Sequence, residues 1–323
     1  MKAVRYVALA IVGLLILAVA AVAIAVAVID PNTYKPQIEK VVESKTNLDL
    51  ILAGDIGWSF IPLGLELNDV EATLEDERLV KLDQLVAQVS FWSLITMSPR
   101  VDTFLLSGLD ANLSVDANGT GNWTRIMPEG EEQPQQEEPA APAETAEEQP
   151  ESSGASEPLN FNVESVEISN ARVHYEDKGT GQAFTLEDFT VNASEITLGS
   201  SFPLDVSFRF ATNQPQFEVQ GDISARLAAN EALNEFGVSD LEAIFDMNGE
   251  PFGGESVRAE IAGSLEANLE NETATLNGFT ASLADLTLNT DLTVNGFGDK
   301  PKLEGSLSID EFSLKALLAA LGQ

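Results

Sequence analysis

One uncharged segment near the amino terminus constrains this chain more than any other feature. Residues Tyr6–Ile29 form a stretch of 24 residues without a charge, and Lys2 and Arg5 precede it. A helix of that length rises about 36 Å, which is enough to cross the roughly 30 Å hydrocarbon core of a bilayer. The sequence therefore predicts a single transmembrane anchor over residues 6–29, with residues 1–5 as a cytoplasmic stub.

A cleavable signal peptide is the alternative, because Ala23-Ile24-Ala25 and Ala25-Val26-Ala27 both have the small-x-small form of a cleavage site. The apolar part of a signal peptide runs only about 7 to 15 residues, so the length favours an uncleaved anchor. Three lysines within residues 35–45 balance the basic residues before the span, so charge alone does not orient it. The short head and long tail favour a tail outside the cytoplasm.

Composition excludes several classes of function. The chain has no cysteine, which rules out disulfides, a thiol nucleophile and cysteine-ligated zinc. Its formal net charge of -35 repels polyphosphate backbones and anionic lipid surfaces alike, so nucleic acid is not an expected partner. Solubility, or adaptation to a salty environment, is the plainer explanation of the charge.

An acidic segment divides the remainder of the chain. Residues 128–158 contain ten Glu, no basic residue and no apolar residue larger than alanine. Such a composition buries too little surface to offset its ordering entropy, which predicts a disordered insert, with a docking tail as the alternative. The flanking regions are residues 30–127, a helix plus strands, and residues 159–323, a β-repeat region.

A repeated unit flanks the insert, with a shift of 62 residues. Val101, Phe104, Leu106, Ser107, Leu109 and Ala111 fall on Val163, Val166, Ile168, Ser169, Ala171 and Val173. Each copy ends in a turn-rich tip, residues 116–121 in the first and 176–181 in the second. Glycine and asparagine adopt positive φ at little cost, so both tips are predicted to be hairpin ends.

The rest of the chain alternates apolar and polar residues, as in residues 204–210 and 286–289. This period of two is typical of strands with one apolar and one polar face, and we count about fifteen of them. Two segments have helical spacing instead. They are residues 34–42, with Asn47 as the expected left-handed C-terminal cap, and residues 314–321, followed by Gly322.

The first helix carries an apolar stripe of Tyr34, Ile38, Val41 and Val42, at positions i, i+4, i+7 and i+8. A stripe with this spacing is expected to face a neighbouring element. We therefore predict that the stripe packs this amphipathic helix on the entrance of the sheet.

A series of motifs after the apolar segment resembles the AsmA family of bacterial envelope proteins. The motifs are Asp30-Pro31-Asn32-x-Tyr34-Lys35-Pro36, Gly54-Asp55-Ile56-x-Trp58, Pro62-x-Gly64-Leu65-Glu66-Leu67 and Asn118-Gly-x-Gly-Asn122-Trp123. Residues 101–123 and 312–322 also resemble segments of the family. Asn47 departs from the glycine that the family commonly has there. Longer relatives continue beyond the segment that resembles residues 312–322, so a short or truncated member is expected.

The resemblance implies a single-pass protein of the inner membrane with most of its chain in the periplasm and a role in outer-membrane biogenesis. It also implies likeness to bridge-like lipid transfer proteins, whose curved sheets form an open groove. The expected fold is therefore mainly β. It has a transmembrane helix, a short amphipathic helix, a long curved antiparallel-type sheet forming a groove, and a short C-terminal helix.

Lipid handling is the leading functional hypothesis, with inner-membrane lipids as partners, together with outer-membrane assembly or lipid-transfer proteins. The alternative is a membrane-tethered scaffold or regulator of outer-membrane protein assembly and targeting, without lipid transfer. The predicted lining of the groove is Val166, Ile168, Phe208, Phe210, Phe217, Val219, Leu286, Leu288, Leu292 and Leu303. The core of an ordinary β-sandwich is the alternative interpretation of these residues. Fifteen strands side by side would span about 70 Å, less than two bilayers.

Catalytic and metal sites are not predicted. His174 is the only histidine, which leaves no Ser-His-Asp arrangement with a spare base and no histidine-rich metal site, and we expect it on a strand surface. Asp116 begins a calcium-like loop, but Met127 occupies the position that needs a bidentate Glu. No enzyme activity and no cofactor are therefore expected.

Overall fold

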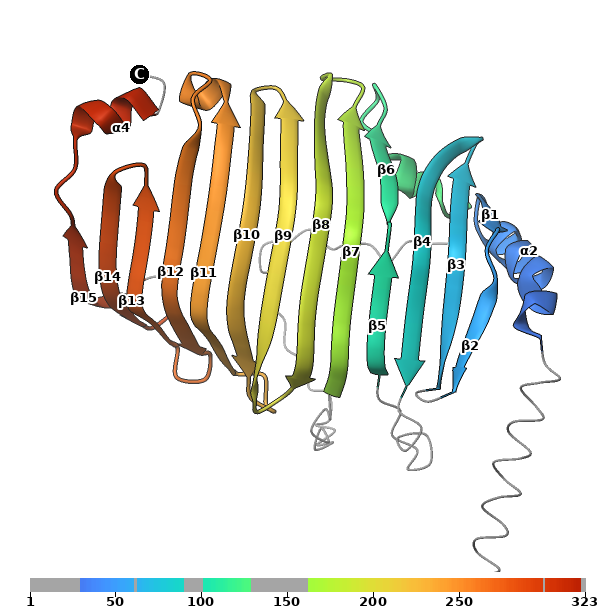
Figure 1. Cartoon of the computed structure of the whole chain (residues 1–323), viewed down its shortest axis with the longest axis horizontal. Coiled ribbons are helices and arrows are strands. Elements are labelled where there is room, and N and C mark those ends of the chain that lie inside the picture. Colours follow the sequence, from blue (N-terminus) through green and yellow to red (C-terminus); the bar gives the residue numbers. More distant parts are fainter. Residues whose placement is uncertain (1–29, 61–62, 90–100, 129–161, 299, 321–323) are drawn as a thin grey trace, which may run out of the picture.

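The computed structural model describes residues 30–60, 63–89, 101–128, 162–298 and 300–320 (Figure 1). Within these ranges fifteen strands form one sheet, so the chain is mainly β as predicted. The expected anchor at residues 6–29, residues 129–158 of the insert, and Leu321 with Gly322 lie outside the described residues. No helix in the described ranges is long and apolar enough to cross a bilayer.

The strands are β1 (Leu48–Leu52), β2 (Ile56–Phe60), β3 (Leu63–Leu74), β4 (Glu77–Val89), β5 (Val101–Ser107), β6 (Asp110–Val115), β7 (Asn162–Asp177), β8 (Gln182–Thr197), β9 (Ser201–Asn213), β10 (Gln216–Ala229), β11 (Glu235–Gly249), β12 (Val257–Asn268), β13 (Thr273–Leu283), β14 (Leu286–Asn295) and β15 (Lys302–Ile309). The helices are η1 (Pro31–Tyr34), α2 (Lys35–Lys45), η2 (Asn122–Arg125), η3 (Glu250–Phe252) and α4 (Leu314–Ala320).

The sheet is a long ribbon whose strands follow the chain order almost without exception (Figure 1). Strand β2 pairs with β3 on the side where β1 also pairs, and β6 shares the row of β5 between β4 and β7. Two of the fifteen strands therefore add no width, which leaves thirteen rows. At about 4.8 Å per step the ribbon spans about 58 Å, so the expected 70 Å was too long.

The sheet is mixed, which corrects the prediction of an antiparallel-type sheet. Strand β7 runs parallel to both β5 and β6, while every other pair is antiparallel. The parallel register joins Phe104 to Val166 and Ala111 to Val173, each at the separation of 62 residues found in the sequence. The two copies of the repeat therefore lie side by side, position against position.

Hydroxyl groups connect the two copies on the same register. The Ser165 hydroxyl donates to Thr103 Oγ1 at 3.2 Å, and the Ser169 hydroxyl donates to Ser107 Oγ at 3.1 Å. The tips of the copies differ. The second joins β7 to β8 as a hairpin, as predicted, whereas the first closes with the single bridge Val115–Gly121 and continues into η2.

Asn122 hydrogen-bonds the part of the β6 backbone edge that does not pair with β4. Its side-chain amide donates to the Asn112 carbonyl at 2.9 Å, and its side-chain oxygen accepts from the Ser114 N–H at 3.1 Å. Asn122 thereby supplies the two hydrogen bonds that a neighbouring strand would supply, and it is buried. This accounts physically for the asparagine in the Asn118-to-Trp123 motif.

Left-handed residues lie within many of the strands, and one of them, Gly108, lies between β5 and β6. The interruption follows one sequence pattern: two apolar residues three positions apart, with a left-handed residue directly before the second. The segments are Leu67-Asn-Asp69-Val70, Leu106-Ser-Gly108-Leu109, Ile168-Ser-Asn170-Ala171, Leu186-Glu-Asp188-Phe189, Val238-Ser-Asp240-Leu241 and Leu276-Asn-Gly278-Phe279. The register against a neighbouring strand shifts at four of these segments, those that begin with Ile168, Leu186, Val238 and Leu276. A bulge with an extra residue there bends the strand and returns the next apolar side chain to the same face.

Helix α2 lies beside β1 at the first end of the ribbon, as predicted (Figure 1). Its apolar stripe does not face the sheet: Tyr34 is 48%, Ile38 40% and Val41 59% exposed, and only Val42 is half-buried. The prediction for the stripe is therefore wrong. Polar contacts hold the helix instead, since the Leu52 N–H donates to Glu39 Oε1 at 2.9 Å.

The exit of α2 also differs from the prediction. Thr46 ends the helix in an extended conformation, and its hydroxyl donates to the Val42 carbonyl at 2.8 Å. Asn47 is not left-handed, and its side-chain amide donates to the Arg125 carbonyl at 2.8 Å. Asn47 therefore ties the helix exit to the end of η2 rather than capping the helix through a positive φ.

Asn170, with φ of 53°, gives a test of the bulges. We expect Asn170→Val to lower the free energy of unfolding by about 1 to 3 kcal/mol, because a β-branched residue is strained in the left-handed region. Asn170→Gly is the matched control and should leave the free energy of unfolding nearly unchanged. Urea unfolding followed by circular dichroism measures both, and equal stability of the two variants would contradict the bulge assignment.

Candidate functional site

The ten predicted lining residues all lie on one face of the sheet. Cross-strand partners share a face, and so do alternate residues of a strand. Val166 in β7 pairs with Ala193 in β8, which pairs with Leu204 in β9. Phe208 and Phe210 follow Leu204 at two-residue steps, with no register shift against β10.

The same face continues to the other end of the ribbon. Phe210 pairs with Val219, and the matching rows pass through β11 and β12 to Leu283, which pairs with Leu286. Val294 then pairs with Leu303 in β15. In the other direction the row of Ile168 runs through Leu106, Leu85 and Leu67 to β3. We call this surface the apolar face; it comprises the ten residues and their cross-strand partners.

No second layer covers the apolar face in the described part of the chain. Nine of the ten predicted residues are half-buried, and Leu303 is 62% exposed. None of the large side chains described is fully buried, and the few buried apolar residues are mostly small or lie near β1 to β4. The sandwich-core interpretation is therefore wrong for the described residues, because a sandwich would bury these side chains against a facing sheet.

Aromatic rings form a row across one end of the apolar face. The ring centroids of Trp123 and Tyr175 are 6.5 Å apart, those of Tyr175 and Phe184 4.6 Å, and those of Phe184 and Phe210 5.7 Å. Such ring pairs stabilise their arrangement beyond the area they bury. Of these four only Phe210 was predicted for the lining, although Phe184 lies in an alternating segment that signals a strand.

Gly221 shapes the middle of the face because the Phe208 ring lies over it. A Cβ atom added at Gly221 would approach Phe208 Cε1 to 2.5 Å, closer than van der Waals contact allows. The missing side chain therefore leaves the space that the Phe208 ring occupies.

The opposite face is polar and carries ion pairs. Arg258 donates from Nε and from one terminal nitrogen to the two carboxylate oxygens of Asp246, both at 2.8 Å. The hydrogen bond from Arg258 lowers the pKa of Asp246. Any stability from this pair is present above the ordinary pKa of the carboxyl group and is lost as the pH falls through the lowered pKa.

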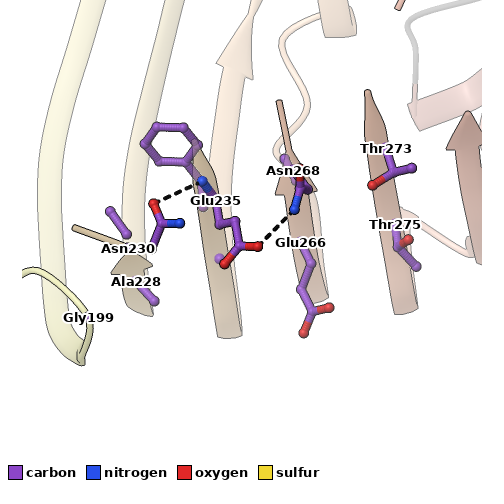
Figure 2. Close-up of a pocket in the computed structure, with 12 residues that line it drawn as sticks. Gly199, Ala228, Asn230, Glu235, Glu266, Asn268, Thr273 and Thr275 are labelled. Carbon is purple, nitrogen blue, oxygen red and sulfur yellow. Dashed lines mark hydrogen bonds between the residues drawn. The ribbon is translucent and has the colours of Figure 1, made fainter. Parts of the chain in front are cut away.

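A hollow of about 450 Å³ opens at one end of β10 to β13 (Figure 2). Ala228, Gly237, Glu266 and Thr275 pair across its strands on the polar side, and Phe236 and Ala267, which also line it, pair in the register of the apolar face. Asn268 donates to Glu235 Oε1 at 2.8 Å across its rim. The hollow is wide open and its lining is mixed, with Glu235 and Glu266 beside Phe236. The apolar face is an uncovered surface rather than an enclosed cavity.

His174 lies on the polar side of β7, half-buried, with Nδ1 3.2 Å from Thr185 Oγ1. The described residues contain no group of three or more histidine, aspartate or glutamate side chains arranged to hold a metal ion. At the predicted calcium-like loop, Asp116 Oδ1 accepts from the N–H groups of Asn118 at 2.8 Å and Thr120 at 3.0 Å. The Asp116 carboxylate therefore stabilises the backbone of its own turn.

The sequence profile of the AsmA family matches residues 1–296. The chain belongs to the AsmA family. The match includes strands β1 to β14 and ends before β15 and α4, so the resemblance noted at residues 312–322 lies beyond it. Searches of curated proteins and of solved structures gave no match.

The first AsmA motif of the chain also has a structural role. Asp30 caps η1 by accepting from the Asn32 N–H at 2.9 Å. The Asn32 side chain then accepts from the Ile56 N–H at 2.9 Å and donates to the Ile56 carbonyl at 3.3 Å. Asn32 thus hydrogen-bonds the backbone of β2 in the way that Asn122 hydrogen-bonds the backbone of β6. Family membership is consistent with a role in envelope or lipid-related biogenesis.

Gly221→Ala tests the close approach of Phe208 to the sheet. The added methyl group must displace the ring, so we expect a loss of about 1 to 3 kcal/mol in unfolding free energy. Gly237→Ala in β11 is the matched control, because its Cβ would meet Ala228 Cβ at an ordinary 3.6 Å. Thermal unfolding compares the two, and an equally stable Gly221→Ala protein would show that the ring does not need this space.

Proposed function

We propose that this protein is held in the inner membrane, extends into the periplasm and carries phospholipid on its apolar face during envelope biogenesis. The observation that supports this most is the continuous apolar face from β3 to β15 that no described element covers. On this proposal the sheet curves into a groove that holds acyl chains, while the headgroups stay in water. Membership of the AsmA family is consistent with such an envelope or lipid-related role.

The physical argument rests on the size of the uncovered apolar surface. A soluble monomer rarely leaves an apolar patch of more than a few hundred Å² open to water. Here the apolar side chains of many consecutive strands remain half-exposed, and Leu307 and Ile309 in β15 are 66% and 54% exposed. Each lipid CH₂ group moved from water onto this surface would contribute up to about 0.8 kcal/mol. Acyl chains therefore match the face in chemistry and in extent.

The length of the ribbon limits the proposed task. Thirteen rows span about 58 Å, and two bilayers with their headgroups are about 80 to 90 Å thick before any gap between them is added. One copy would therefore not bridge two membranes by itself. The proposal is that it receives lipid at the inner membrane and passes it to a further carrier or assembly partner.

Site-specific photo-crosslinking tests lipid carriage directly. A benzoylphenylalanine replacing Phe208 should crosslink radiolabelled phospholipid in membranes that contain the full chain. The same probe replacing Ser207 faces the polar side and should give at most about a tenth of that signal. Equal labelling at both positions, or none at Phe208, would rule out carriage on the apolar face.

Polar substitution separates lipid carriage from the scaffold alternative. We expect Phe208→Asp to abolish complementation of a deletion strain, because a charge on the apolar face repels acyl chains. Ser207→Asp, its neighbour on the polar face, is the matched control and should complement normally. Protein abundance and circular dichroism check that both variants fold. A scaffold would tolerate Phe208→Asp in a folded, abundant protein and respond instead to charge changes on the polar face.

A further inference from the structure

The apolar stripe of α2 has no partner among the described residues. Tyr34, Ile38 and Val41 occupy one side of the helix and are 48%, 40% and 59% exposed. On the neighbouring side, Lys35 and Val42 are half-buried against the sheet. Consecutive helical residues are about 100° apart, so the stripe points along the outside of the protein rather than into it.

Polar contacts fix the direction of this stripe. Asn32 bonds both backbone groups of Ile56, Glu39 accepts from the Leu52 N–H, and Lys35 Nζ lies 3.5 Å from Asp55 Oδ1. These contacts join η1 and α2 to β1 and β2 at several points. The helix therefore cannot turn its apolar side inward without breaking hydrogen bonds to strand backbone.

The position of α2 in the chain points to what covers the stripe. The uncharged 24-residue segment ends at Ile29, and η1 begins only two residues later, at Pro31. A bilayer that holds this segment would have its surface within a few residues of Tyr34. Tyrosine and tryptophan are enriched at that depth, and Trp58 on the adjacent β2 is 43% exposed.

The charge of α2 fits an anionic lipid surface. The helix carries three lysines and two glutamates; Lys35 pairs with Asp55, whereas Lys40 and Lys45 are exposed. The helix is therefore far less acidic than the whole chain, whose formal charge is -35. Lysines beside an apolar stripe are typical of helices that lie in the membrane interface.

We propose that the stripe of Tyr34, Ile38 and Val41 lies in the headgroup region of the membrane that anchors the chain. This contact holds the β1–β3 end of the ribbon against the bilayer, so that the apolar face begins at the lipid surface. The inference rests on the proposed membrane location but not on lipid carriage.

The absence of cysteine allows a site-resolved test in the full chain. Ile38→Cys, Val41→Cys and the control Glu43→Cys are each labelled with a small fluorophore, and Glu43 lies about 140° to 160° round the helix from the other two. The proteins are reconstituted in phosphatidylethanolamine and phosphatidylglycerol vesicles. Flotation first checks membrane insertion, and nitroxide lipids with the spin label near the headgroup then quench fluorophores in the interface.

We expect quenching at positions 38 and 41 to be at least twofold stronger than at position 43. A chain that floats with the vesicles but shows equal quenching at all three positions overturns this inference and leaves the proposed lipid carriage standing. A chain that does not float overturns the inference together with the membrane location in the proposed function. Ile38→Asn should weaken quenching at Val41→Cys, which a stripe facing water would not show.

Discussion

Hydrogen bonding between neighbouring strands holds this structure together, because the described part of the chain has almost no enclosed core. Each of the long strands from β7 to β14 is paired along most of its length on both sides. The few buried apolar side chains are not enough to form a second layer. A sheet that satisfies its backbone in this way can leave one side-chain face unpartnered without exposing polar backbone groups.

The composition of the apolar face could be predicted from the sequence, but the path of the strands could not. Alternation places Phe208 and Phe210 on one face whichever strands they pair with, and the ten residues predicted for the lining share one face of the sheet. The parallel pairing of β7 was missed, because alternation of apolar and polar residues is the same whether the neighbouring strand runs parallel or antiparallel. The bulges were missed because they shift the alternation by one position, although the spacing Ile168-Ser-Asn170-Ala171 contains the signal.

The stripe of α2 shows a different limit of sequence patterns. Helical spacing correctly groups Tyr34, Ile38 and Val41 on one side, but it does not say what that side meets. The direction of the stripe is set by Asn32 and Glu39, whose hydrogen bonds to strand backbone join residues 24 and 13 positions apart in the sequence. Contacts of that range depend on the folded arrangement and leave no periodic trace in the chain.

The register between the two repeat copies has a consequence for how such chains change in evolution. A unit that pairs with its own duplicate, as Thr103 does with Ser165, already has a compatible neighbour when it is copied. Tandem duplication would then add new rows to the ribbon while leaving the existing contacts intact. A single duplication could therefore lengthen the ribbon without changing its fold.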